Sequence, residues 1–217
     1  MSATASDDEL TPDLAAQKLG DRRPLASRST GWAALANRAL LATGLSANQV
    51  SFMGIIAAAL GGWAAWAGGH GYPWLFALAA IGIQARLLFN MLDGMVAVEG
   101  GRGGPTGAIW NELPDRVEDS ILLVAVGYAG AWPVLGWFAA LLAAVCAYVR
   151  LLGGTLGFAQ DFGGPMAKPH RMAALTLTVL VAIFWRDAPA VGLATIASGT
   201  LLTIGLRVRR LAARLRG

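Results

Sequence analysis

The sequence predicts an all-α, polytopic membrane protein with six transmembrane helices and an N-terminal interfacial helix. Its 217 residues are 56% hydrophobic and 14% charged, whereas soluble domains are about 45–50% apolar and about 25% charged. The charges are also unevenly spread, since no Asp, Glu, Lys or Arg occurs between Arg38 and Arg86. A bilayer-crossing helix needs roughly 20 apolar residues, so this pattern excludes a soluble protein with a single core.

Six apolar segments alternate with polar or Gly-rich loops. The predicted spans are residues 48–68, 73–98, 106–130, 133–157, 172–186 and 188–207. Ser46 and Asn48 offer N-cap oxygens at the start of the first span, and Pro133 suits the first turn of the fourth. Residues 32–44 are amphipathic but too short to span, so they are predicted to form the interfacial helix.

The distribution of basic residues predicts the topology. Residues 1–30 are expected to form a flexible cytoplasmic tail, residues 31–208 the six-helix membrane domain, and residues 209–217 a basic cytoplasmic tail. Lys and Arg are concentrated in the loops and ends on one side of the predicted bundle. By the positive-inside rule, that side faces the cytoplasm in a multi-pass protein of the cell inner (plasma) membrane. The sequence pI near 9.8 therefore reflects topology and contact with membrane lipids, and no nucleic-acid partner is expected.

Polar side chains gather at the facing ends of the second and third predicted spans. Asn90 and Asp93 share one helical face, while Asn111, Asp115 and Asp119 follow one another at four-residue steps. Such groups are costly at membrane depth and usually mark a function. Because oxygen ligands suit hard cations such as Mg²⁺ or Mn²⁺, the pattern predicts a metal–phosphate site at this end of the bundle.

A simpler interpretation is a solvated helix start, in which Asp115, Arg116, Glu118 and Asp119 form local ion pairs. The second span argues against it, because Asp93 lies in an otherwise apolar helix. A third possibility is a small transporter, since charged residues also line ion pathways. The clustering of these charges at one membrane face disfavours transport.

The segment from Asn90 to Asp115 resembles the signature of the CDP-alcohol phosphotransferase family, Asp-x2-Asp-Gly-x2-Ala-Arg-x8-Gly-x3-Asp-x3-Asp. The positions that agree in identity and spacing are Asp93, Gly94, Ala97, Gly107 and Asp115. Residues 44–51 are similar to the nucleotide-contacting start of the first helix in that family. The resemblance implies an enzyme that transfers a phosphatidyl group from CDP-diacylglycerol to an alcohol and releases CMP, with residues 31–208 as its catalytic domain.

The resemblance also implies roles for individual residues, with the active site at the cytoplasmic face of a homodimer. Asp115 is the expected catalytic base. The expected ligands for Mg²⁺ or Mn²⁺ are Asn90, Asp93, Asn111 and Asp115. The residues expected to bind CDP are Ser46, Ala47, Asn48, Gln49, Gly94, Ala97, Gly104 and Gly107. The residues expected at the phosphate of an inositol-phosphate or glycerol-phosphate acceptor are Arg150, Lys168, Arg171 and Arg207.

Three positions depart from the signature. Asn90 and Asn111 stand at the first and third aspartates, and Val98 stands at the arginine. Asparagine keeps one carbonyl oxygen as a ligand but loses the negative charge. The nearby residues that could compensate are Glu112, Glu118 and Asp119 for the carboxylates, and Arg86 and Arg102 for the arginine. These departures also raise the alternative of a relative that binds CDP-lipid or metal without turnover.

Overall fold

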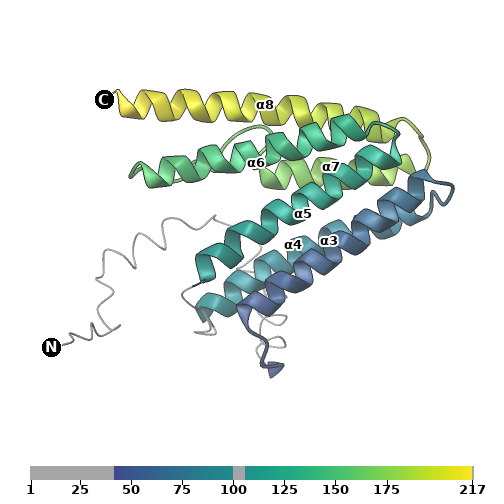
Figure 1. Ribbon diagram of the computed structural model, residues 1–217, viewed down its shortest axis with the longest axis horizontal. Coiled ribbons are helices and arrows are strands. Elements are labelled where there is room, and N and C mark those ends of the chain that lie inside the picture. The colour runs from purple at the N-terminus through teal and green to yellow at the C-terminus, as the bar shows by residue number, and fades with distance from the viewer. Residues whose placement is uncertain (1–41, 100–105, 217) are drawn as a thin grey trace.

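The structure, a computed structural model, describes residues 42–99 and 106–216 (Figure 1). Its helices are α3 (Ala47–Gly69), α4 (Leu75–Glu99), α5 (Gly107–Ala129), α6 (Pro133–Thr155), α7 (Lys168–Ala182) and α8 (Ala188–Leu215). Turns and loops join them in these two ranges, which contain no strand, so the predicted all-α class is confirmed. The predicted tail at 1–30 and nearly all of the predicted interfacial helix at 32–44 lie outside the described residues.

The predicted bounds of the first four spans differ from α3–α6 by at most two residues, whereas three later bounds were wrong. The predicted fifth span ends at 186, but helix α7 ends at Ala182. Helix α7 begins at Lys168 rather than at 172, because Pro169 occupies its first turn, where a missing N–H breaks no helical hydrogen bond. Helix α8 continues to Leu215. The predicted basic tail is therefore helical over 209–215, as its Arg, Leu and Ala content favours.

Four described helices are long and apolar enough to cross a membrane by length and composition: α3, α4 over Leu75–Ala97, α6 and α8. Helix α7 has 15 residues, and α5 carries most of the charged residues of the predicted metal site. Large apolar side chains project outward, and Leu60, Val134 and Phe184 are at least 60% exposed. An apolar outer surface of this kind suits lipid contact.

The six helices form a closed bundle in the order α3, α4, α7, α8, α6, α5, with α5 also contacting α4 and α8 (Figure 1). Successive helices alternate in direction. The C-terminal ends of α4, α6 and α8 consequently lie at the same end of the bundle as the N-terminal ends of α3, α5 and α7. This end, on the left in Figure 1, receives the polar residues that the sequence analysis singled out.

Glycine brings the backbones of α3 and α4 together. A Cβ added at Gly82 would lie 2.6 Å from the Gly61 Cα and 3.0 Å from the Ala57 carbonyl oxygen. Helices α5 and α6 approach in the same way at Gly127 and Gly136. Small residues permit such close approach where lipid supplies no hydrophobic drive between helices, so these contacts set the positions of α4 and α5.

We expect Gly82→Ala to destabilise the folded protein by about 1–3 kcal/mol, because the added methyl must push α3 and α4 apart. Thermal unfolding in detergent measures this loss. Gly205→Ala is the matched control, since a Cβ there meets no atom within 4 Å. Equal unfolding temperatures for both variants would contradict the packing role of Gly82.

Candidate functional site

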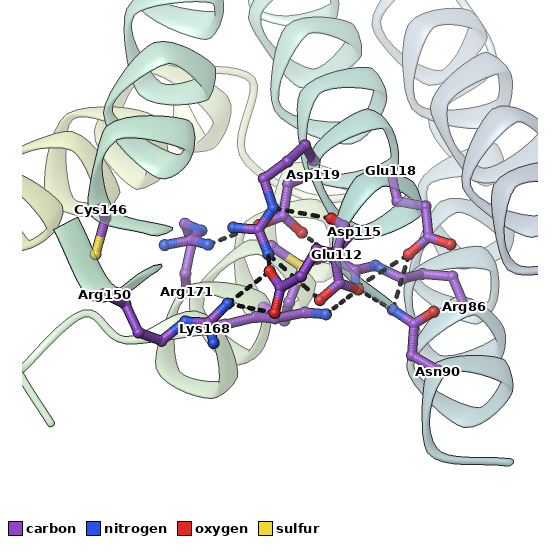
Figure 2. Close-up of polar contacts among 12 residues, drawn as sticks. Arg86, Asn90, Glu112, Asp115, Glu118, Asp119, Cys146, Arg150, Lys168 and Arg171 are labelled. Carbon is purple, nitrogen blue, oxygen red and sulfur yellow. Dashed lines mark hydrogen bonds and ion pairs between the residues drawn. The ribbon is translucent and has the colours of Figure 1, made fainter. Parts of the chain in front are cut away.

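A network of buried charges joins α4, α5 and α7 at the polar end of the bundle, with Arg150 of α6 beside it (Figure 2). Helix α5 supplies the acidic side chains and one cation, Arg116, while the other cations come from the three surrounding helices. Glu118 and Asp119 are almost completely buried, with 0% and 2% exposure. The interpretation of these two residues as part of a solvated helix start is therefore wrong.

Asp119 pairs with two buried arginines from different helices. Arg86 of α4 donates from Nη2 to Asp119 Oδ1, and Arg171 of α7 donates from Nη2 to Asp119 Oδ2 at 2.6 Å. Both guanidinium groups are at most 2% exposed. Since an uncompensated charge in this position would be very costly, Asp119 is what allows both arginines to be buried.

Arg86 also faces two further carboxylates of α5. Its Nη1 lies 3.3 Å from Glu118 Oε2 and 3.8 Å from Asp115 Oδ1. Sequence analysis proposed Arg86 only as a substitute for the arginine missing at 98. Its position one helical turn before Asn90, after a long uncharged stretch, is the signal that could have identified it as the cation of this network.

Asp115, the expected catalytic base, is 17% exposed and has partners from α4, α5 and α7. Arg116 of α5 lies 3.5 Å from its Oδ2. Lys168 of α7 pairs with Asp115 Oδ1, and the Asn90 side-chain amide donates to the same oxygen at 2.5 Å. Lys168 is one of the residues expected at the acceptor phosphate. In the structure, a lysine that was expected to bind the acceptor phosphate therefore forms an ion pair with the expected catalytic base.

Asp93 lies between α4 and α3. Ser51 of α3 donates from Oγ to Asp93 Oδ2 at 2.7 Å, and both side chains are buried. Sequence analysis did not identify Ser51 as a partner. The other carboxylate oxygen, Asp93 Oδ1, is buried without a hydrogen-bond partner, which leaves it available to an added ligand.

The four expected metal ligands are not equally placed. Asn90 and Asp115 lie within the polar network, and Asp93 is buried beside it against Ser51. Asn111 is exposed at the start of α5. Within residues 42–99 and 106–216, no three His, Cys, Asp or Glu side chains converge as a ready-made metal group. The unpartnered Asp93 oxygen nevertheless fits a divalent cation, because buried polar groups normally have partners.

The expected acceptor residues fall into two groups. Lys168 and Arg171 contact the α5 carboxylates. Arg150 and Arg207 instead line a pocket between α6, α8 and the loop that precedes α7, together with Arg210 and Arg214. We call this the arginine pocket. Arg150 links the two groups, because its Nη2 donates to Glu112 of α5 at 2.6–2.7 Å.

The arginine pocket is built partly from backbone contacts. Arg207 is buried and donates to the carbonyl oxygens of Gly163 and Cys146 at 3.0 and 2.9 Å. Arg210 pairs with Asp161 at 2.9 Å. Partial burial raises the pKa of Asp161, but hydrogen bonds from Arg210 and from the Gly163 N–H outweigh this and hold that pKa below its ordinary value.

Those residues expected to bind CDP that the structure describes lie at the polar end of the bundle. Ser46 and Gln49 form a capping box at the start of α3: Ser46 Oγ accepts from the Gln49 N–H, and Gln49 Oε1 accepts from the Ser46 N–H at 2.9 Å. This confirms Ser46 as the N-cap; Ala47 and Asn48 follow in the first turn. Gly94 and Ala97 lie near the C-terminal end of α4, and Gly107 begins α5. Gly104 lies outside the described residues.

Comparison with known proteins identifies relatives of this architecture. A phosphatidylinositol phosphate synthase of Mycobacterium marinum is 27% identical over 182 residues, which cover 79% of this chain and 75% of that protein. The crystal structure of the Mycobacterium tuberculosis phosphatidylinositol phosphate synthase in complex with manganese and citrate superposes with a TM-score of 0.70 at 24% identity, covering 81% of this chain and 87% of that one. The structure of the same M. tuberculosis enzyme with CDP-DAG bound superposes with a TM-score of 0.70 at 24% identity. That match covers 81% of this chain and 91% of the other chain. No family model matches the chain.

Replacing Asp119 by Asn should destabilise the protein by about 3–5 kcal/mol, because it leaves Arg86 and Arg171 buried without their shared carboxylate. Asp161→Asn breaks the more exposed pair with Arg210 and should cost about 0–1 kcal/mol. Unfolding in detergent compares the two variants. Similar losses would show that burial of the Asp119 pairs contributes nothing special to stability.

Proposed function

We propose that this protein transfers a phosphatidyl group from CDP-diacylglycerol to an alcohol and releases CMP. The observation that carries the proposal is the placement of Asp93 and Asp115, the two aspartates that match the family signature, on α4 and α5 at the polar end of the bundle. Asn90, one turn before Asp93 on α4, donates directly to Asp115. The 27% identity to a phosphatidylinositol phosphate synthase also supports it, because the match covers 79% of this chain and so extends well beyond the signature.

The proposed cofactor is Mg²⁺ or Mn²⁺, held by Asp93 and Asp115 with the amide oxygens of Asn90 and Asn111. The unpartnered oxygen of Asp93 fits this role, and a solved relative binds manganese. When bound, the ion supplies charge neutralisation of the pyrophosphate of CDP-diacylglycerol. Ser46, Ala47, Asn48, Gln49, Gly94, Ala97, Gly104 and Gly107 are proposed to contact the CDP moiety.

In the proposed reaction, Asp115 takes the proton of the acceptor hydroxyl. The hydroxyl oxygen forms a bond to the phosphorus that bears the diacylglycerol, and the bond from that phosphorus to the bridging oxygen of CMP breaks. CMP leaves with the electron pair of that bond. Lys168, which already contacts Asp115, lies where it can hold an anionic group beside the base, so positioning contributes much of the rate.

We propose a phosphorylated acceptor, of inositol-phosphate type with glycerol-phosphate as the related possibility. Arginine suits bidentate phosphate binding, and the arginine pocket places Arg150 and Arg207 near Arg210 and Arg214. Arg150 connects this pocket to α5 through Glu112. Arg171 and Lys168, which contact the carboxylates of α5, are also proposed to bind the acceptor phosphate.

We also propose an arrangement of the protein in the membrane. The polar end of the bundle faces the cytoplasm of the inner membrane together with both termini, α5 and α7 cross the bilayer with the four apolar helices, and two copies form a homodimer. The Arg-rich last turns of α8 support this orientation. Anionic headgroups there would meet the exposed arginines.

A binding protein without turnover is the second candidate function. It is favoured by Asn90, whose amide donates to both Asp115 and Glu118, and by the exposed position of Asn111. Both asparagines remove negative charge from the metal site. Release of CMP distinguishes this candidate from the enzyme.

We expect purified protein in detergent to release CMP from CDP-diacylglycerol when Mg²⁺ or Mn²⁺ and a suitable alcohol phosphate are present. Asp93→Ala and Asp115→Ala should each lower the rate by about 10²-fold or more, because loss of a metal ligand costs several kcal/mol of transition-state stabilisation. Asp187→Asn, an exposed change at the opposite end of the bundle, is the control. Metal-dependent CDP-lipid binding without any CMP would favour the binding protein.

Arg150→Ala should raise the KM for the acceptor by about tenfold while leaving the KM for CDP-diacylglycerol nearly unchanged, since the lost guanidinium recognises only the acceptor phosphate. Initial rates at varied acceptor concentration measure this. Arg209→Ala is the control, because Arg209 is exposed on α8 and does not line the arginine pocket. An unchanged acceptor KM in Arg150→Ala, or preference for an uncharged alcohol, would refute the assignment.

A further inference from the structure

Glu118 is a buried carboxylate that the proposed reaction does not use. Its side chain is 0% exposed and lies beside Asn90, the residue that replaces the first aspartate of the signature. Three acidic residues of α5 could supply the charge lost there: Glu112, Glu118 and Asp119. Their contacts differ enough to decide between them.

Glu112 and Asp119 have their oxygens engaged by cations. Both oxygens of Glu112 accept from Arg150, and Oε2 also faces Arg116 at 3.3 Å. Each oxygen of Asp119 accepts from a different arginine, Arg86 or Arg171. Every oxygen of these two residues therefore already has a cationic partner.

Glu118 is different because only one of its oxygens has a partner. Oε2 accepts from the Asn90 amide at 2.9 Å and lies 3.3 Å from Arg86 (Figure 2). Oε1 is buried and accepts no hydrogen bond. A buried carboxylate oxygen without a partner is costly, so this atom is placed for a ligand rather than for stability.

Gly54 of α3 creates the space into which this oxygen projects. A Cβ added there would lie 2.5 Å from Glu118 Oε1 and 3.3 Å from Asn90 Oδ1. Two oxygen donors from α4 and α5 therefore face the same point on α3. A side chain at position 54 would fill the cradle between them.

We propose that Glu118 supplies to the divalent cation the carboxylate that Asn90 lacks, with the Asn90 amide oxygen beside it. The inference rests on the metal site of the proposed function and adds a ligand to it. The proposed ligand set then has three carboxylates, Asp93, Asp115 and Glu118, which would converge on the ion when it binds, so the negative charge of the set is partly restored. Neutralising Arg86 does not by itself explain why Glu118 is buried here, because Asp119 already pairs with Arg86.

The test is titration of the purified protein with Mn²⁺, without CDP-diacylglycerol, following the electron paramagnetic resonance signal of free Mn²⁺. Glu118→Gln keeps the shape of the side chain and removes its charge, so Mn²⁺ affinity should fall by about tenfold or more. Adding Asn90→Asp to Glu118→Gln returns a carboxylate to the signature position and should restore the affinity to within about threefold of the unchanged protein.

Glu112→Gln is the matched control, because it removes a carboxylate of the same helix that already pairs with Arg150, and it should bind Mn²⁺ as the unchanged protein does. Wild-type affinity in Glu118→Gln, failure of Asn90→Asp to restore binding, or absence of Mn²⁺ binding by the unchanged protein would each overturn the inference. If Glu118→Gln does not fold, Gly54→Ala decides: filled space should weaken Mn²⁺ binding, and unchanged affinity overturns the inference.

This experiment separates the inference from the proposed reaction. Mn²⁺ binding that depends on Glu118, together with no CMP release from any alcohol phosphate, would refute the reaction and leave the ligand assignment intact. CMP release together with a Mn²⁺ affinity that does not depend on Glu118 would support the reaction and refute the ligand assignment.

Discussion

The polar end of this bundle depends on one carboxylate, Asp119, which pairs with arginines from two neighbouring helices. A guanidinium buried among apolar helices is strongly unfavourable without a partner, and Asp119 compensates both Arg86 and Arg171. Helices α4, α5 and α7 are thereby tied together at the level of the site. The backbone contact between Gly61 and Gly82 holds α3 against α4 farther from the polar end, so the four helices form one connected frame.

Within this frame, charge compensation and ligand availability compete for the same side chains. Asp119 and Glu112 are fully engaged by arginines and serve the architecture. Asp93 and Glu118 each keep one buried oxygen without a partner, which is expensive unless a ligand meets it. Asp115 is intermediate between these groups, because it is partly exposed and has Lys168, Asn90, Arg86 and Arg116 around it. The carboxylates of the site therefore fall into two groups: those whose ion pairs stabilise the fold, and those with an oxygen available to a ligand.

The contacts of Asn90 explain why an asparagine fits at position 90. Its amide group donates to two carboxylates, Asp115 and Glu118, whereas an aspartate there would repel both. The substitution therefore reduces repulsion within the buried cluster, and its amide oxygen faces Gly54. Asn111, which is exposed, has no comparable place in the network, so the two departures from the signature are not equivalent.

The sequence by itself determined the all-α class, the bounds of the first four helices, the capping role of Ser46 and the end of the bundle where the polar residues gather. These follow from local rules: uninterrupted apolar length, turn residues and helical periodicity. Only the tertiary structure decided which charges pair, because Arg86 and Asp119, or Asp115 and Lys168, are distant in sequence and meet through helix packing. The early start of α7 and the helical continuation of α8 were missed because a run of charged residues and a proline resemble a loop when burial is unknown. Burial and side-chain contacts are properties of the whole bundle, and together they distinguish Glu118, which keeps an unpartnered buried oxygen, from Glu112, which pairs with Arg150.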